Sequence, residues 1–308
     1  MWKQKTSFTR DGIARRGFIK AGALGVFGMT MAHRELAATP VPGEKACILV
    51  FNSGGLSQLD SWDPKPDAPR EVRSPFSAIS TRGDFQVSGA FPRHAAIGDL
   101  FSIVRGVQFD AAALHDVGRS LALTGQIAKG PPSVGGVIAE AGEISDERYG
   151  RNPVGARFLQ ARRLIESGVR FVTLDPFCRD AWDTHGAAPY ATMDEFRDTL
   201  APLYDRAASA LISDLAERGL LDTTLVAAIS DFGRTPWRNA DGGRDHWAGN
   251  WSVYFAGGGV QGGRAIGSSD ELGAYPEGQG FSPQEVLATI KYAIGEEPRG
   301  TTVISDLF

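Results

Sequence analysis

The chain has 308 residues, of which 42% are hydrophobic and 22% are charged, and its formal net charge is −4. This composition is ordinary for a soluble globular protein, and the length is ample for a sizeable core. The charge excludes a broad basic surface for nucleic acid. No stretch beyond the amino-terminal segment is apolar enough to span a membrane.

The first 38 residues have the layout of a bacterial export signal. Paired arginines, Arg15 and Arg16, precede a glycine-rich apolar run over 21–31, and small residues follow at 36–38. This order is typical of the twin-arginine class, so the translocation machinery of that class is an expected partner. The alternative, an amphipathic first helix, is disfavoured by the three glycines of the run. We therefore expect an export signal at 1–38, a single domain over 39–308, and a periplasmic or extracellular location.

Removal of that segment makes the chain more acidic. Without its seven basic and two acidic residues, 25 basic and 34 acidic residues remain, for a net charge of −9. The only cysteines, Cys47 and Cys178, lie in no metal-binding or redox spacing. A disulfide is permitted outside the cytoplasm, but two small buried residues are the favoured interpretation.

Residues 46–51 form a continuous apolar run that predicts a buried strand followed by a ligand-facing loop. In that loop Asp60 and Asp63 either help to hold a cation or form an Asx-type turn, and the turn is slightly favoured. Residues 67–100 show no lasting period and are expected to be irregular, with His94 on the surface. Residues 101–104 predict a second strand.

Helices are predicted at 115–124, which Gly125 closes, and at 134–141. Apolar spacings of three and four predict a third helix around 158–165, and a strand follows at 169–174. Asp183 and His185 come soon after that strand, two residues apart, and a loop could direct both at one metal. The alternative is that His185 is simply hydrogen-bonded.

A long apolar stripe over 196–215 predicts a helix that Pro202 kinks or splits. It leads into a strand at 223–229, which places Asp231 at a strand end, with Arg234 and His246 shortly after. Such a stretch suits a site for an anionic ester or a metal, and chance juxtaposition is the alternative. A strand at 252–256 and a helix at 283–294 complete an α/β pattern with a mostly parallel sheet covered on both faces.

With these residues in place, the sequence resembles the exported, sulfatase-like family called domain of unknown function 1501, within the alkaline phosphatase superfamily. The matching segments are the twin-arginine signal, GGLSQLDSWDPKPDAP, ARRLIESGVRFVTL, WDTH, DLAERGLLDTTLV, SDFGRTP, GRDHW and AGGGVQGG. They are spread over almost the whole chain. The resemblance implies an alkaline phosphatase or sulfatase-like fold and a site that binds divalent metal, zinc first, with calcium or manganese as alternatives.

Carried onto this chain, the resemblance implies four metal ligands, Asp183, His185, Asp231 and His246. The pattern is broken at a second metal site, where Asn52 to Gly54 replace an early acid and Phe232 replaces a histidine or asparagine. A histidine, His115, stands at the nucleophile position, and it cannot become the formylglycine of sulfatases. It could ligate metal, accept a phosphoryl group or act as an acid or base, or be a helix-terminal histidine satisfied by backbone.

Two functions follow from the resemblance. In the first, the protein is a metal-dependent hydrolase of a phosphate, sulfate or related ester, in which Arg119 and Arg234 hold the anionic group. In the second, it is a non-catalytic binding protein that recognises an envelope glycan or another exported partner. The retained Asp and His residues favour the first, and the departures at Phe232 and the first strand favour the second.

Overall fold

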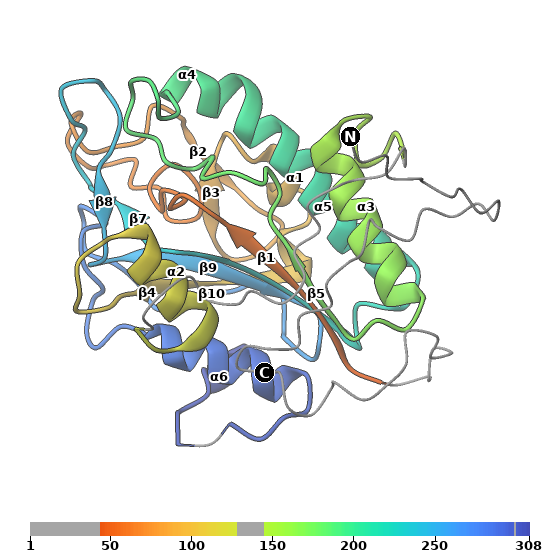
Figure 1. Ribbon diagram of the computed structural model, residues 1–308. Helices are drawn as coiled ribbons and strands as arrows, with labels where there is room; N and C mark the ends of the chain where they lie inside the picture. The colour runs from red at the N-terminus through yellow and green to blue at the C-terminus, as the bar shows by residue number, and fades with distance from the viewer. Residues whose placement is uncertain (1–43, 128–144, 299) are drawn as a thin grey trace, which may run out of the picture.

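The computed structural model describes residues 44–127, 145–298 and 300–308. The expected export signal at 1–38 and the helix predicted at 134–141 lie outside these residues. A six-stranded sheet crosses the middle of the molecule and has helices on both faces (Figure 1).

The sheet is mixed but mostly parallel. Its strands in spatial order are β10 (Ala265–Ile266), β4 (Phe101–Val107), β9 (Trp251–Ala256), β6 (Thr224–Ser230), β1 (Ala46–Asn52) and β5 (Phe171–Leu174). Strand β1 pairs in parallel with β5 and β6, and β10 pairs in parallel with β4. Strand β9 lies antiparallel to both of its neighbours, β4 and β6. The predicted α/β class with a mostly parallel sheet is confirmed.

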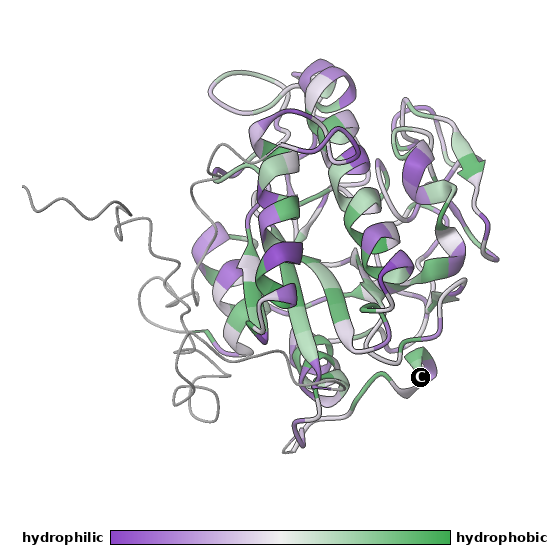
Figure 2. Cartoon of the chain, turned by 90° about the vertical axis from the view of Figure 1, so that its right-hand side faces the viewer, coloured by the Kyte–Doolittle hydropathy of each residue, from purple (hydrophilic) through white to green (hydrophobic). Residues whose placement is uncertain are grey.

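Helices α3 (Pro153–Glu166) and α5 (Ala201–Glu217) cover one face of the sheet, and α2 (His115–Thr124) and α6 (Pro283–Ala293) cover the other (Figure 1). Alternate residues of β1 therefore enter different cores: Ile48 joins the α3 and α5 side, and Leu49 joins the α2 and α6 side. Because both faces are buried, the strand reads as a continuous apolar run. Figure 2 shows hydrophobic strands enclosed by helices that carry hydrophilic residues.

The helix ends follow local sequence signals. Asn152 caps α3 by accepting the Gly155 N–H at 3.0 Å, and Ser282 forms a capping box with Glu285 at the start of α6. Pro202 is the second residue of α5, and the chain before it forms α4 (Met193–Glu195) and a π-helical segment over Phe196–Leu200. The predicted interruption at Pro202 is therefore present as a change of helix type.

The stretch expected to be irregular, 67–100, contains short regular elements. Strands β2 (Ala78–Ser80) and β3 (Gln86–Ser88) pair antiparallel, and α1 (Pro92–Ala95) follows. His94 is wholly buried, contrary to the surface position expected, because its Nδ1 bonds to Asp205 at 2.6 Å within a group of aromatic rings. Asp205 lies 111 positions from His94, so no local sequence pattern predicts that the two residues pair.

Two further observations concern the described part of the chain. None of its helices is long and apolar enough to cross a membrane. Cys47 is buried in β1, as expected, whereas Cys178 is exposed, so the favoured interpretation of two buried residues is wrong for Cys178.

Candidate metal centre

The site lies at the edge of the sheet where β1, β5 and β6 end. Because these strands are parallel, their carboxyl ends meet at one edge, and the loops that follow them converge. Asp231 directly follows β6, and Asp183 lies in the loop after β5. His246 lies in the two-residue strand β8 (His246–Trp247), which pairs with β7 (Gly233–Arg234), and His115 begins α2.

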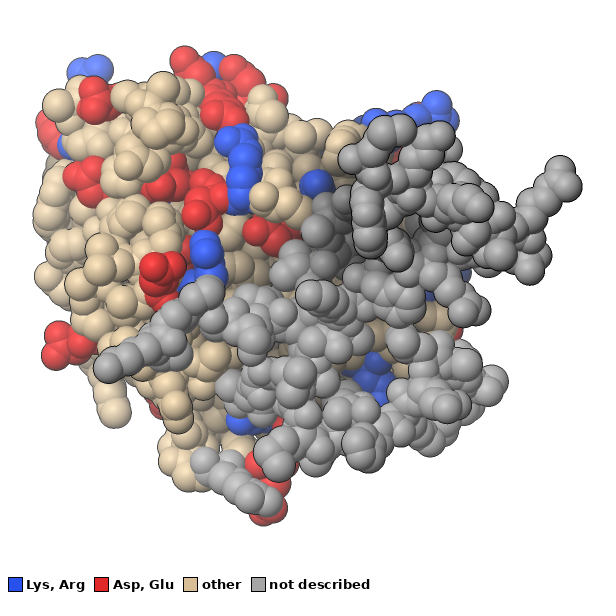
Figure 3. All heavy atoms as spheres, viewed as in Figure 1, with Lys and Arg blue, Asp and Glu red and all other residues tan. Residues whose placement is uncertain are grey.

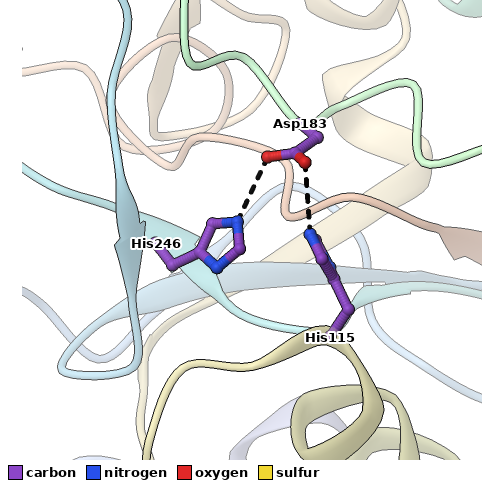
Figure 4. Close-up of side chains that lie close together, drawn as sticks. All are labelled: His115, Asp183 and His246. Atoms are coloured by element: carbon purple, nitrogen blue, oxygen red, sulfur yellow. Dashed lines mark hydrogen bonds and ion pairs between the residues drawn. The ribbon is translucent and has the colours of Figure 1, made fainter. Parts of the chain in front are cut away.

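The carboxylate of Asp183 is the centre of this cluster. Figure 4 shows the rings of His115 and His246 directed at its two oxygens. The three nearest imidazole nitrogens are His185 Nε2 at 3.1 Å, His246 Nε2 at 3.2 Å and His115 Nε2 at 3.4 Å. Candidate donor atoms of His115, Asp183 and His246 all lie within 4.8 Å of one another. The histidine side chains are about one fifth exposed, at 21%, 23% and 22% for His115, His185 and His246, so the cluster is reachable from solvent.

Each of these histidines is also held at its other nitrogen. His115 Nδ1 bonds to Asp231 at 2.7 Å, His185 Nδ1 to Asp245 at 3.0 Å, and His246 Nδ1 to the carbonyl of Ala113 at 2.8 Å. All three partners are acceptors, so each Nδ1 is the donor. Each Nε2 donates to the Asp183 carboxylate in the metal-free protein and would offer its lone pair to a metal once that proton is lost. An acceptor on the far nitrogen of a histidine is the usual support of a metal ligand. The residues present therefore fit a divalent metal between the Nε2 atoms and Asp183.

Asp231 supports His115 from behind. Its carboxylate accepts the backbone N–H groups of Gly54 and Gly55, both at 3.1 Å, as well as His115. Gly54 has a φ of +103°, and a Cβ there would stand 2.6 Å from the Asp183 nitrogen. The structure thus places Asp231 next to His115, and its oxygen also groups with His115 and Asp180.

A glycine inside α2 brings His115 close enough to make these contacts. A Cβ at Gly118 would lie 2.5 Å from the carbonyl oxygen of Asp231 and 2.7 Å from the ring of Phe232. The helix therefore touches the end of β6 by backbone, which a larger residue would prevent. Phe232 is fully buried, and its ring lies 4.9 Å from His115 and 4.6 Å from His246.

The two predicted anion-binding arginines differ. Arg234 is wholly buried, and its guanidinium donates to Asp183 at 2.6 Å and to the carbonyls of Gly54, Gly55 and Arg244. These contacts leave it to fix the site and not to bind an incoming anion. Arg119 is 27% exposed and bonds to the exposed Asp180 at 2.5 Å, so it is the one of the pair that a substrate can reach. Arg244 is likewise buried, paired with Asp60.

The electrostatics of the cluster follow from this packing. Burial would raise the pKa of Asp183, but hydrogen bonds from His115 and His246 and the charge of Arg234 hold it far below its usual range. Burial would lower the pKa of His115, yet hydrogen bonds to Asp183 and Asp231 raise it to about 9. Without a metal, His115 therefore carries a proton on each nitrogen, and a metal ion would replace the proton on Nε2.

One supporting residue was not foreseen from the sequence. Asp245, beside His246, accepts from His185 and from the side-chain amide of Asn239 at 2.9 Å. Its place in GRDHW was the available signal, but only the chain reversal through β7 and β8 shows that it faces His185.

The comparisons with known proteins agree with this picture at the level of family. The model of the family described as protein of unknown function (DUF1501) matches residues 44–146 and 139–304. The chain belongs to this family. No curated protein matches it.

Among solved structures, a crystal structure of Ps i-CgsB in complex with k-i-k-neocarrahexaose is 10% identical, with a TM-score of 0.45 over 84% of this chain and 74% of that chain. The structure of PH0037 protein from Pyrococcus horikoshii is 14% identical, with a TM-score of 0.33 over 82% of this chain and 96% of that chain. The family itself is described as one of unknown function.

Proposed function

We propose that the protein is an exported, metal-dependent hydrolase of a phosphate, sulfate or related ester, with an alkaline phosphatase or sulfatase-like site. The observation that carries the proposal is the triple arrangement around Asp183. His115, His185 and His246 each direct Nε2 at its carboxylate while an acceptor holds Nδ1. A structural ion-pair cluster needs no such matched support of every histidine.

The donor set also bears on the metal. Imidazole nitrogens favour zinc, whereas calcium and manganese prefer oxygen ligands. His115, Asp183 and His246, whose donor atoms lie within 4.8 Å of one another, would hold the ion, with His185 as a further donor beside Asp183. When bound, the ion would act as a Lewis acid on an ester oxygen, and three protein ligands would leave the open position that catalytic zinc sites keep.

The chain's own residues supply the remaining chemistry. Arg119 would bind the anionic group at the exposed side of the cluster, once it exchanges Asp180 for the substrate. Arg234 would hold Asp183 in place, and Asp231 would keep the proton of His115 on Nδ1. Phe232 excludes water from the inner side of the histidines.

A second function, a non-catalytic binding protein for an envelope glycan or an exported partner, is favoured by one observation. The wholly buried ring of Phe232 fills the place where the superfamily pattern has a second metal ligand. The two functions give different results in the same experiment, because a binding protein needs no turnover and no metal.

The test is metal content and turnover of protein isolated from its natural compartment. We expect about one equivalent of a transition metal per chain, measured by elemental analysis, and hydrolysis of p-nitrophenyl phosphate or sulfate that chelation abolishes. His246→Ala should lower metal affinity at least about tenfold while circular dichroism stays unchanged. Asp241→Asn, in the same loop but outside the cluster, is the matched control. Unchanged metal content in His246→Ala would overturn the assignment.

His115→Ala separates a ligand from a reacting group. If His115 is a ligand, metal content and turnover fall together; if it accepts a phosphoryl group or acts as acid or base, turnover falls and metal is retained. Because its Nε2 faces Asp183 and its Nδ1 is held by Asp231, we expect both to fall. Full activity of this variant would show that His115 is only structural.

A further inference from the structure

Three aromatic residues form a row beside the metal centre. Trp237 and Tyr275 are 49% and 53% exposed, and Trp247 lies between them. The ring centroids are 5.8 Å apart from Trp237 to Trp247 and 5.4 Å from Trp247 to Tyr275. The Trp247 indole N–H donates to the Ala274 carbonyl at 2.6 Å, which fixes its ring. A row of solvent-exposed aromatic rings is typical of a surface that binds a ligand or a partner.

Tyr275 belongs to this row and also lines a groove with a volume of about 910 Å³. Its walls are rich in side-chain amides, among them Gln108 and Gln284. One amide N–H of Gln108 donates to the Gln279 carbonyl at 2.9 Å, and one of Gln284 donates to the Gly125 carbonyl at 2.8 Å. These bonds fix the two amide planes, so the groove is lined by polar groups of fixed orientation.

The charge of the groove excludes one large class of ligand. None of the described residues that line it is a lysine or an arginine, and its charged residues are Asp110 and Glu285. Aromatic platforms for nucleic acid lie in positively charged grooves, because the phosphate backbone must be neutralised. Figure 3 shows no broad field of basic side chains among the described residues of the face that it presents. A ligand that is rich in hydroxyl groups and has apolar ring faces fits better.

The groove and the metal centre share two chain segments. One runs from Gln108 to His115, and the other from His246 to Gly249. They are joined by a bond from the Phe109 N–H to the Ala248 carbonyl at 3.2 Å and by the bond of His246 Nδ1 to Ala113. A ligand in the groove is therefore held by the same two segments that position two of the metal-site histidines.

We propose that this groove and its aromatic row bind an oligosaccharide chain, whose anionic ester is presented to the metal centre. The aromatic rings would stack on sugar faces, and the amides would bond to sugar hydroxyls. The part about the ester rests on the proposed function, whereas sugar binding by the groove does not.

The test is binding of the purified, metal-loaded protein to a printed glycan array and to soluble laminarin, galactan and chondroitin sulfate in affinity electrophoresis. We expect binding to at least one of these probes, weakened about tenfold or more by Trp247→Ala and by Tyr275→Ala. Tyr292→Ala is the control, because that tyrosine is also exposed, at 49%, but stacks against Phe308 near the other end of α6. Loss of binding in the control as well would contradict a role for the row.

Failure of this proposal is distinguishable from failure of the proposed function. Binding that survives in His246→Ala, while metal and turnover are lost, supports the groove independently of catalysis. A protein that holds metal and turns over small esters but binds no probe retains the hydrolase proposal and overturns the groove. Trp247-dependent binding of single-stranded DNA or of a peptide library in place of glycans would overturn it too.

Discussion

At the scale of single residues, one ion pair is wholly buried beside the site. Asp60 and Arg244 are both wholly buried and 2.7 Å apart, and Asp60 also accepts from the hydroxyls of Ser57 and Ser74. Burial would raise the pKa of Asp60, but the Arg244 guanidinium and these hydroxyls hold it below its ordinary value. The acid is therefore a structural anchor for the 57–74 loop, held by an arginine from a remote segment.

Asp60→Asn should lower the free energy of unfolding by about 3 kcal/mol or more, because it leaves Arg244 buried without a counter-charge. Urea denaturation followed by tryptophan fluorescence measures this. Asp67→Asn lies in the same loop but is exposed, and it should change stability by less than about 0.5 kcal/mol. Equal, small effects of both variants would show that the pair contributes nothing.

The burial of charged and polar side chains was the property least predictable from the sequence. Arginines are usually solvated, yet Arg234 and Arg244 are wholly buried, and the buried His94 pairs with Asp205. Each depends on a carboxylate or carbonyl from a remote segment: Asp183 lies 51 positions from Arg234, and Asp60 lies 184 positions from Arg244. No local pattern contains that information. Asp183, His185 and His246 were foreseen because they are of metal-ligating types and two of the three follow predicted strands.

At the scale of elements, one carboxylate joins α3 to α5. Asp214 of α5 accepts from Tyr149 at 2.7 Å and from Arg218 at 2.8 Å, and it pairs with Arg162 of α3 at 3.1 Å. Burial would raise the pKa of Asp214, but the Tyr149 and Arg218 hydrogen bonds and the Arg162 charge outweigh it and lower that pKa. The pair of helices is therefore held more firmly when this group is ionised.

The folded-state pKa of Asp214 is below its unfolded value, so its contribution is fully present above about pH 4 and is lost as the pH falls through the folded value. Asp214→Asn should cost about 2 kcal/mol at pH 7 and progressively less below pH 4. Denaturation curves of both proteins from pH 7 to pH 3 measure the difference. A difference that stays constant over this range would contradict the assignment.

Helices and strands were predictable where a single hydrophobic pattern runs through the whole segment. The strand at 46–51 and the helix at 115–124 were found almost to the residue, since apolar continuity and a left-handed Gly125 mark them. Strands β2 and β3 and helix α1 were missed, because three- and four-residue elements have no period to detect. Their position depends on packing against Phe101 and Tyr204.

At the scale of the whole molecule, the expected export signal predicts that the protein folds before it crosses the membrane. Twin-arginine transport suits proteins that acquire a metal before they cross the membrane. Changing both Arg15 and Arg16 to lysine keeps the charge of the signal and should leave the precursor in the cytoplasm. Cell fractionation and immunoblotting measure its size and location, and Arg10→Lys is the control. Normal processing of the double variant would rule out this class of signal.

The order of the strands has a consequence for synthesis. Strands β1, β5 and β6 form one half of the sheet and β4 and β10 the other, and among the described strands only β9 pairs with both halves. His115 follows β4, whereas Asp183 and Asp231 follow strands of the other half. Strand β9 emerges from the ribosome after all of these residues, so in a nascent chain that lacks it the two halves are held together only by contacts such as that of α2 with the end of β6. If the proposed metal is bound, its retention reports closure of the whole sheet, and we expect fragments that end before Trp251 to bind it more weakly although they contain every proposed ligand.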